Sequence, residues 1–217
     1  MQIGSVTLKN KTILAPLAGI TNLPFRLLAK EAGCALVCSE MISAHGLINK
    51  SGRTQQMLDS LPEERPLSVQ LFGSQPDVMA EAARFVESSG ADIIDINFGC
   101  SVRKIIKTGS GVALMKTPET AEAVIKAVRK VVRIPLTIKI RAGWNPAGNQ
   151  AFQISQIAES CGVDAITIHP RTATQGFSGH SDCCLLYTSP SPRDRSAYRV
   201  CRLLLEKWGG GGGGGGG

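Results

Sequence analysis

Apolar runs of strand length alternate with amphipathic stretches of helix length along the first 182 residues. Six runs rich in β-branched residues stand out: TILAPLA (12–18), ALVCSEM (35–41), PLSVQLF (66–72), DIIDIN (92–97), PLTIKI (135–140) and AITIH (165–169). Strands that alternate with helices indicate right-handed βαβ units and a parallel sheet. The fold class is therefore α/β, with a sheet that is either open and doubly wound or closed into a barrel.

Helix start and stop signals flank the stretches between the runs. Ser74 is the expected N-cap of one helix, with Pro76 in its first turn, and Thr117 precedes another helix. Gly90 and Gly162 stand where C-terminal helix caps are expected. Apolar residues at helical spacing follow both start signals, so one face of each helix should pack against the sheet.

Polar side chains interrupt the later strands with a period of two. Four of them lie near the carboxyl ends of successive strands, in one register: Gln70, Asn97, Lys139 and His169. Asp95 shares the face of Asn97, and Thr137 shares that of Lys139. A parallel sheet is buried on both faces, and a lone buried lysine costs several kcal/mol unless it is paired. These groups therefore either surround a polar ligand or form a self-satisfied internal network.

The ligand interpretation places the polar groups at the carboxyl-end mouth of a barrel. It favours a TIM (β/α)8 barrel over an open sheet. A complete barrel of this type has eight strand–helix units, and six strands are recognisable before residue 183. We therefore expect a TIM barrel truncated after about six βα units.

The composition is that of one globular domain, with 43% hydrophobic and 19% charged residues. No apolar run approaches the ~20 residues that cross a bilayer, and no charged-then-apolar leader opens the sequence. We therefore expect a cytoplasmic, monomeric protein without a membrane partner. The net charge is +7, of which residues 183–217 contribute five basic and two acidic residues. The mildly basic remainder is compatible with a nucleic-acid partner but does not argue for one.

The composition changes near residue 183. CCLLYTSPSPRDRSAYRVCRLLLEKW precedes nine consecutive glycines, and no helical or strand period continues through this segment. LLYTSPSPRDRS resembles translated sequencing-adapter sequence. We therefore interpret residues 1–182 as a partial barrel domain and residues 183–217 as a non-native tail; the alternative is a flexible linker or tail.

Four cysteines lie outside this tail, at positions 34, 38, 100 and 161. Cys34 and Cys38 have no second close pair or nearby histidine, so we expect reduced thiols and no metal site. Cys100 follows the DIIDIN strand and precedes Arg103 and Lys104. Taken alone, Cys100 is either a packed thiol or a reactive one.

Seven collinear motifs in residues 1–182 resemble those of bacterial tRNA-dihydrouridine synthases of the B type. They are APLAGITNLPFR (15–26), SEM (39–41), VQLFG (69–73), DINFGC (95–100), KTGSG (107–111), IKIRAGW (138–144) and IHPRTATQGFSGHSD (168–182). This family carries flavin mononucleotide (FMN) on a TIM barrel; NADPH reduces the flavin, which reduces the 5,6 double bond of selected uridines in tRNA. The resemblance therefore implies an FMN-binding partial barrel, with NADPH as reductant and tRNA as substrate.

The resemblance also implies individual cofactor contacts, from Pro16, Leu17, Ala18, Gln70, Lys139 and His169. The segment from Pro16 to Ala18 would lie along the isoalloxazine ring. Gln70 would hydrogen-bond the pyrimidine edge of the flavin. The Lys139 cation would stabilise negative charge on the reduced ring, and His169 would lie close to it.

Cys100 stands at the position of the family's proton donor. Hydride passes from the flavin to carbon 6 of the uracil ring, and carbon 5 then needs a proton that a thiol can supply. Asn97 would hold the target base, and the loop from Cys100 to Gly111 would close over it. Phosphates of tRNA would contact basic residues on loops at the carboxyl ends of the strands: Arg103, Lys104, Lys107 and Arg171. Arg141 is a further expected substrate or tRNA contact. The alternative for such residues is a solvated surface charge.

Two departures from the family pattern matter. Ser101 follows the cysteine where the family has proline, and we find no counterpart of the seventh and eighth strands that hold the flavin phosphate. Two other functions stay open. One is a flavin barrel acting on free pyrimidines, such as a dihydroorotate or dihydropyrimidine dehydrogenase, against which the basic residues after Cys100 argue. The other is an inactive fragment with open sheet edges and at most weak RNA binding.

Overall fold

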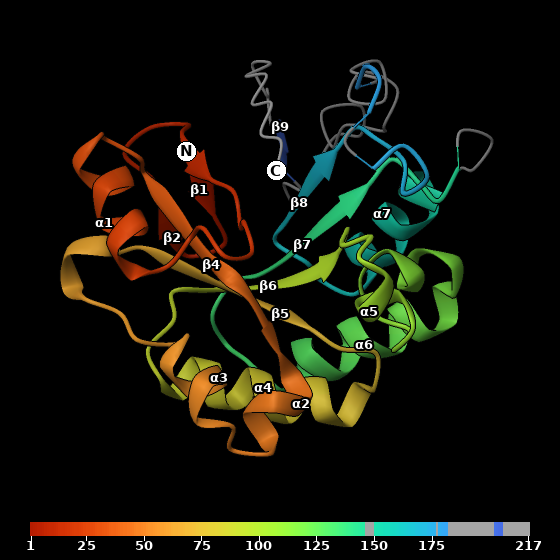
Figure 1. Cartoon of the computed structure of the whole chain (residues 1–217), viewed down its shortest axis with the longest axis horizontal. Coiled ribbons are helices and arrows are strands. Elements are labelled where there is room, and N and C mark those ends of the chain that lie inside the picture. The colour runs from red at the N-terminus through yellow and green to blue at the C-terminus, as the bar shows by residue number, and fades with distance from the viewer. Residues whose placement is uncertain (146–149, 177, 182–201, 206–217) are drawn as a thin grey trace, which may run out of the picture.

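The computed structural model describes residues 1–145, 150–176, 178–181 and 202–205. Its centre is a seven-stranded parallel sheet whose strands pair in sequence order. The strands are β3 (Ile13–Leu14), β4 (Leu36–Ser43), β5 (Leu67–Phe72), β6 (Ile93–Phe98), β7 (Leu136–Arg141), β8 (Ala165–His169) and β9 (Arg202–Leu205). Strands β3 to β8 overlap the six predicted runs, and the sheet curls into part of a TIM-type barrel (Figure 1). The predicted truncated barrel is confirmed.

Helices connect successive strands. They are α1 (Leu23–Glu31), α2 (Ala44–Ile48), α3 (Gly52–Gln56), α4 (Pro76–Ser88), α5 (Arg103–Ile106), α6 (Pro118–Val131) and α7 (Gln150–Ser160), with the short 3-10 helices η1 (Pro62–Glu64) and η2 (Gly111–Lys116). Along the sheet α2 packs against α4, α4 against α6, and α6 against α7. No helix in the described part of the chain is both long and apolar enough to span a membrane.

The helix boundaries match the capping signals with one exception. Thr117 is the N-cap of α6, and Gly90 and Gly162 follow helices with φ values of +89° and +77°. The prediction for Ser74 is wrong, because α4 begins at Pro76 with Gln75 as its N-cap. The Ser74 hydroxyl instead donates to the carbonyl of Thr108 at 2.7 Å, so it joins two loops.

Strand register separates a polar face of the sheet from an apolar one. Gln70 is paired with Asp95, Asp95 with Thr137, and Asn97 with Lys139. Successive residues of a strand point to opposite faces, so these polar side chains share one face. The intervening apolar residues join the helices in one core, which includes Ile94, Ile96, Ile138, Ile140, Met79, Val86, Val124 and Ile125.

A short antiparallel hairpin of β1 (Gln2–Ile3) and β2 (Val6–Thr7) lies outside the parallel sheet. Ile3 and Leu8 form a small apolar cluster with residues that begin β4, β6 and β8. The hairpin therefore covers the amino-terminal end of the sheet, while the strands point away from it (Figure 1). Sequence patterns did not predict it, because two-residue strands are too short to show a period.

The last described segment is β9, which pairs in parallel with β8. It lies inside the stretch that the sequence separates as a tail, so a strand forms there although no strand period was expected. The predicted tail otherwise falls on residues 183–201 and 206–217, which lie outside the described residues. Its assignment as non-native stays a prediction.

Candidate active site

A buried polar network crosses three neighbouring strands on the polar face of the sheet. Gln70 Nε2 donates to Asp95 Oδ2 at 2.6 Å, and Thr137 Oγ1 donates to Asp95 Oδ1 at 2.5 Å. Asn97 Nδ2 donates to Gln70 Oε1 at 2.8 Å. All four side chains are buried. The sequence left two interpretations open, a bound polar ligand or an internal polar network. For Gln70 and Asn97 the internal network is present.

The network fixes the orientation of both amides. Gln70 turns its amino group to the Asp95 carboxyl and its oxygen to the Asn97 amino group. Gln70 keeps one N–H for another partner. Asn97 also places its oxygen toward two backbone N–H groups of its own loop. Its predicted contact with a base would require some of these bonds to be exchanged.

Cys100 is held through its backbone. Its N–H donates to Asn97 Oδ1 at 2.9 Å, and the neighbouring Gly99 N–H donates to the same oxygen at 3.1 Å. The Cys100 carbonyl accepts from Val112 N at 3.0 Å. The side chain itself is half-buried. The thiol therefore stands on a turn fixed from both sides, directly after β6.

Gly111 makes this turn possible. Its φ is +64°, and a Cβ at this position would lie 2.6 Å from the Cys100 carbonyl oxygen. Only glycine combines this backbone conformation with so close an approach. The KTGSG motif thus packs the end of the loop directly against Cys100.

His169 lies among cationic side chains at the carboxyl end of β8. Burial lowers its pKa from the ordinary 6.5 to about 4, and the nearby charges of Lys139, Arg141 and Arg171 act in the same direction. The imidazole is therefore neutral at neutral pH, with one nitrogen that donates and one that accepts. This concentration of positive charge favours an anionic or electron-rich ligand.

The two arginines of this group have different environments. Arg141 is buried and donates to the carbonyls of Gly99 (2.8 Å), Thr172 (3.0 Å) and Gly176 (2.9 Å), so it joins the loops that follow β6 and β8. Its contact with tRNA stays a prediction. Arg171 donates through Nη2 to a loop carbonyl, but its buried Nε has no partner among the described residues. A buried N–H of this kind calls for an acceptor.

The loop after β3 carries the first predicted cofactor contacts. Pro16 and Leu17 are half-buried and Ala18 is exposed. Thr21 Oγ1 accepts from Leu17 N at 3.1 Å and lies 3.2 Å from Leu17 O, to which it can donate. The threonine hydroxyl therefore closes the loop on itself at the carboxyl end of β3.

Three of the basic residues predicted to contact tRNA lie on α5 or directly after it. Arg103, Lys104 and Lys107 are exposed, whereas Ile105 is buried and anchors the helix. The helix begins three residues after Cys100. The charged groups thus lie in solvent, close in sequence to the thiol. Their exposure agrees both with contact to tRNA phosphates and with an ordinary solvated surface.

Sequence reasoning did not assign Asp95, Thr137 or Met41 to the site. Asp95 and Thr137 follow the same period of two as the predicted residues, so that signal was sufficient to find them. Met41 Sδ lies 3.8 Å from Asn97 Nδ2. Met41 belongs to the SEM motif, but that motif gave no role for it. Three or more potential metal ligands do not cluster anywhere in the described ranges.

Fold and site together define a barrel protein of the (β/α) class whose polar residues gather at the carboxyl ends of its strands, where barrel enzymes carry their active sites. Residues 13–184 match the family model described as dihydrouridine synthase (Dus). The chain belongs to the dihydrouridine synthase family.

Curated relatives agree with this assignment. The chain is 42% identical to tRNA-dihydrouridine synthase B of Klebsiella pneumoniae over 182 residues, which cover 84% of the chain and 57% of the relative. It is 41% identical to the protein of the same name from Escherichia coli strain K12, with the same coverage. The chain thus spans little more than half the length of these relatives.

Solved structures resemble the chain in fold. Histamine dehydrogenase from Rhizobium sp. 4-9 matches with a TM-score of 0.55 and 12% identity, over 77% of this chain and 36% of that one. A phosphonopyruvate hydrolase complex with oxalate and Mg++ matches with a TM-score of 0.57 and 16% identity, over 88% of this chain and 65% of that one. At such identities the likeness shows the fold alone.

Proposed function

We propose that this chain is part of an enzyme that reduces uridine in tRNA to 5,6-dihydrouridine, with FMN as cofactor and NADPH as reductant. The observation that carries the proposal is the position of Cys100. The chain belongs to the dihydrouridine synthase family, and this thiol stands two residues after the end of β6. Arg141, one of the cationic residues near His169, donates to the carbonyl of Gly99 next to it.

The residues present fit the redox ring of FMN. Lys139 and Arg171 supply positive charge that suits a ring carrying negative charge when reduced. The buried Arg171 Nε needs an acceptor, Gln70 keeps one N–H, and neutral His169 can donate or accept. The ring would lie against the loop of Pro16, Leu17 and Ala18.

When bound, reduced FMN supplies a hydride to carbon 6 of the uracil ring. Cys100 would hold a proton at Sγ and deliver it to carbon 5. Asn97 supports this role by fixing the backbone N–H of Cys100. Contact of Asn97 with the base itself is the further role that the family resemblance implies.

The exposed side chains of Arg103, Lys104 and Lys107 would contact tRNA phosphates beside the thiol. Arg141 and Arg171 would act closer to the base. A uridine must leave its stack to reach the carboxyl ends of the strands, and such an extruded base suits a recessed site better than a flat surface.

Replacement of the thiol tests the proposal. In the full-length enzyme, Cys100→Ala should slow formation of dihydrouridine by about 10²–10⁴-fold, the range typical of a lost general acid. The product is measured by mass spectrometry of nucleosides from previously unmodified tRNA. Cys34→Ala is the matched control, because Cys34 donates to the Leu36 carbonyl at the other end of the sheet.

Unchanged activity of Cys100→Ala would reject the thiol as proton donor. The same enzyme is also assayed on uracil and dihydroorotate. Turnover of these free pyrimidines without turnover of tRNA would reject the tRNA substrate and favour a pyrimidine dehydrogenase.

A further inference from the structure

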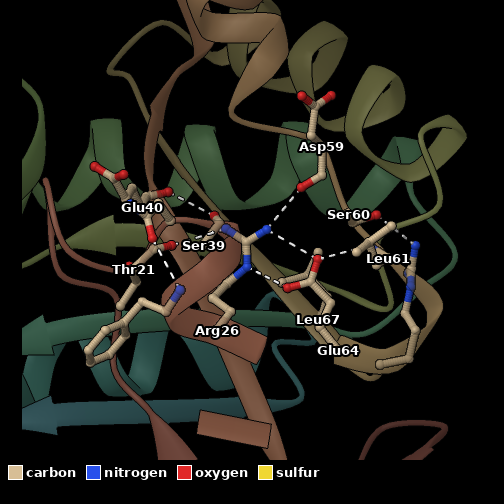
Figure 2. Close-up of polar contacts among 12 residues, drawn as sticks. Thr21, Arg26, Ser39, Glu40, Asp59, Ser60, Leu61, Glu64 and Leu67 are labelled. Atoms are coloured by element: carbon tan, nitrogen blue, oxygen red, sulfur yellow. Dashed lines mark hydrogen bonds and ion pairs between the residues drawn. The ribbon is translucent and has the colours of Figure 1, made fainter. Parts of the chain in front are cut away.

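Arg26 of α1 and Glu64 of η1 form a buried ion pair outside the polar network of the candidate active site (Figure 2). The Arg26 side chain is 3% exposed, and that of Glu64 is fully buried. The contact is bidentate, with Nε 2.5 Å from Oε2 and Nη2 3.1 Å from Oε1. Residues 38 positions apart in the chain are thereby joined.

The guanidinium also holds two backbone carbonyls. Nη1 donates to the Thr21 oxygen at 3.0 Å, and Nη2 donates to the Asp59 oxygen at 2.9 Å (Figure 2). Glu64 Oε1 accepts from Leu61 N at 3.2 Å. A planar guanidinium that is bound in this way has one orientation. The Thr21 carbonyl is therefore held at a fixed position relative to α1 and η1.

Thr21 transmits this position to the loop after β3. Its side chain is fully buried, and its hydroxyl bonds both the N–H and the carbonyl of Leu17. The Leu17 carbonyl also accepts from the N–H groups of Ile20 and Thr21, each at 3.0 Å. A continuous series of hydrogen bonds thus runs from Glu64 through Arg26 and Thr21 to Leu17.

Net stability is a weak explanation for such a pair. Removing two charges from water costs several kcal/mol per ion, and apolar residues of similar size often replace a buried pair without loss of stability. An apolar replacement could not hold the Thr21 carbonyl. What the pair supplies is a geometric constraint on the loop.

We propose that Arg26 and Glu64 are positioning residues that set the conformation of the loop from Pro16 to Thr21. In the proposed function this loop would lie along the flavin ring. The significance of the inference rests on that proposed function. Neither residue needs to touch the cofactor or the substrate. They act through the Thr21 carbonyl and hydroxyl.

Amide hydrogen exchange, followed by NMR in the 217-residue chain, tests the constraint. The double variant Arg26→Met with Glu64→Leu leaves no buried charge unpaired, so it should keep the fold. Exchange at the amides of Leu17, Ile20 and Thr21 should accelerate about tenfold relative to the wild type, because their hydrogen-bonded arrangement loses its anchor. Exchange of the β6 and β7 amides should stay unchanged.

Two single variants separate the causes. Arg26→Lys keeps the positive charge beside Glu64 but loses the fork that reaches Thr21, so it should accelerate loop exchange as the double variant does. Thr21→Val removes the hydroxyl and leaves the ion pair in place. It should accelerate exchange at Leu17 as well, even if the double variant fails to fold.

Arg65→Met is the matched control. Arg65 directly follows Glu64 and pairs with Asp92 at 3.0 Å, and it donates to the carbonyl of Gly90 and the hydroxyl of Ser60. Its loss should leave exchange at Leu17 as in the wild type. If Thr21→Val accelerates exchange while the folded Arg26→Met/Glu64→Leu variant does not, the ion pair is not the anchor and the proposal fails.

Fluorescence titration with FMN connects the constraint to the cofactor. If the wild-type chain binds FMN, the double variant should bind it about tenfold more weakly, and equal affinity would show that the loop conformation does not serve flavin binding. If the wild-type chain binds no FMN, the flavin assignment for this chain fails. The exchange experiment then still decides whether Arg26 and Glu64 position the loop.

Discussion

At the scale of single residues, the polar face of the sheet is determined by which side chains the strand register places next to one another. Asp95 lies between Gln70 and Thr137 and accepts from both. Asn97 completes the network and fixes the turn of Cys100. The same polar residues therefore orient each other and position the thiol, whereas the cationic side chains around His169 lie on β7 and in the loop after β8.

His169 gives a pH-dependent prediction at this scale. Its pKa is lowered to about 4 in the folded protein, against 6.5 in the unfolded chain. Between these values the unfolded state binds the extra proton, so the free energy of unfolding should fall as pH decreases from 6.5 toward 4. His169→Asn should flatten this slope in urea denaturation measured across the same range.

NMR titration of the imidazole provides an independent check. Lys139→Met removes one neighbouring positive charge and should raise the midpoint for His169, because the imidazolium form is then less disfavoured. A wild-type midpoint near that of a free imidazole would contradict the environment described for this residue.

At the scale of elements, the segment from the end of β6 to the start of η2, which carries Cys100, has fixed contacts at both ends. It begins at the Asn97-capped turn and ends where Val112 donates to the Cys100 carbonyl. Ser74 holds its middle through Thr108. The exposed charges of α5 extend from a backbone that is itself constrained.

Two glycines in this loop give a matched pair of substitutions. Gly111→Ala would place a methyl group 2.6 Å from the Cys100 carbonyl oxygen at a φ of +64°, whereas Gly109→Ala at +73° would meet its nearest atom, Ser74 Oγ, at 3.4 Å. Gly109→Ala should lower the free energy of unfolding by about 1–2 kcal/mol through backbone strain alone. Gly111→Ala should lower it by about 2–4 kcal/mol, because overpacking adds to the strain.

Chemical denaturation measures both effects. The reactivity of the Cys100 thiol toward a maleimide, read by peptide mass spectrometry, should change in Gly111→Ala more than in Gly109→Ala. Equal loss of stability in the two variants would indicate that the close approach to Cys100 has no energetic consequence.

At the scale of the whole molecule, the sheet is open at β3, which pairs only with β4 among the described strands. Helix α1 and the loop before it lie near this edge and expose three large apolar side chains: Ile20 (47%), Phe25 (39%) and Leu28 (61%). In a closed barrel every helix has a neighbour on both sides.

The sequence-based expectation of a monomer does not allow for these exposed apolar side chains. Because of them, the 217-residue chain should self-associate through this region. Leu28→Lys should shift the chain toward monomer in analytical ultracentrifugation over a concentration series, with little change in the free energy of unfolding. Phe152→Lys is the control, since Phe152 is similarly exposed on α7, which connects β7 and β8, far from β3 in the strand order. Equal effects of both variants would contradict an interface near α1.

The sequence predicted the repeating architecture well because each main strand is rich in β-branched apolar residues, and prolines and glycines flank helices α4 and α6. It also located the residues near the carboxyl ends of the strands, since parallel strands bring equivalent positions together. It could not predict how Gln70 and Asn97 orient their amides, because that depends on Asp95 across a strand boundary. The Arg26–Glu64 pair was equally inaccessible, because nothing local links a helix residue to one 38 positions later.

The hairpin of β1 and β2 determines where a label or tether attached to residue 1 would lie. Met1 and Leu8 exchange hydrogen bonds, with Leu8 N donating to Met1 O at 2.7 Å and the Met1 ammonium donating to Leu8 O at 3.2 Å. A fluorophore or surface tether joined to residue 1 would thus project beneath the barrel, on the side away from Cys100. Protein immobilised through that end would keep the carboxyl ends of its strands accessible to macromolecules from solution.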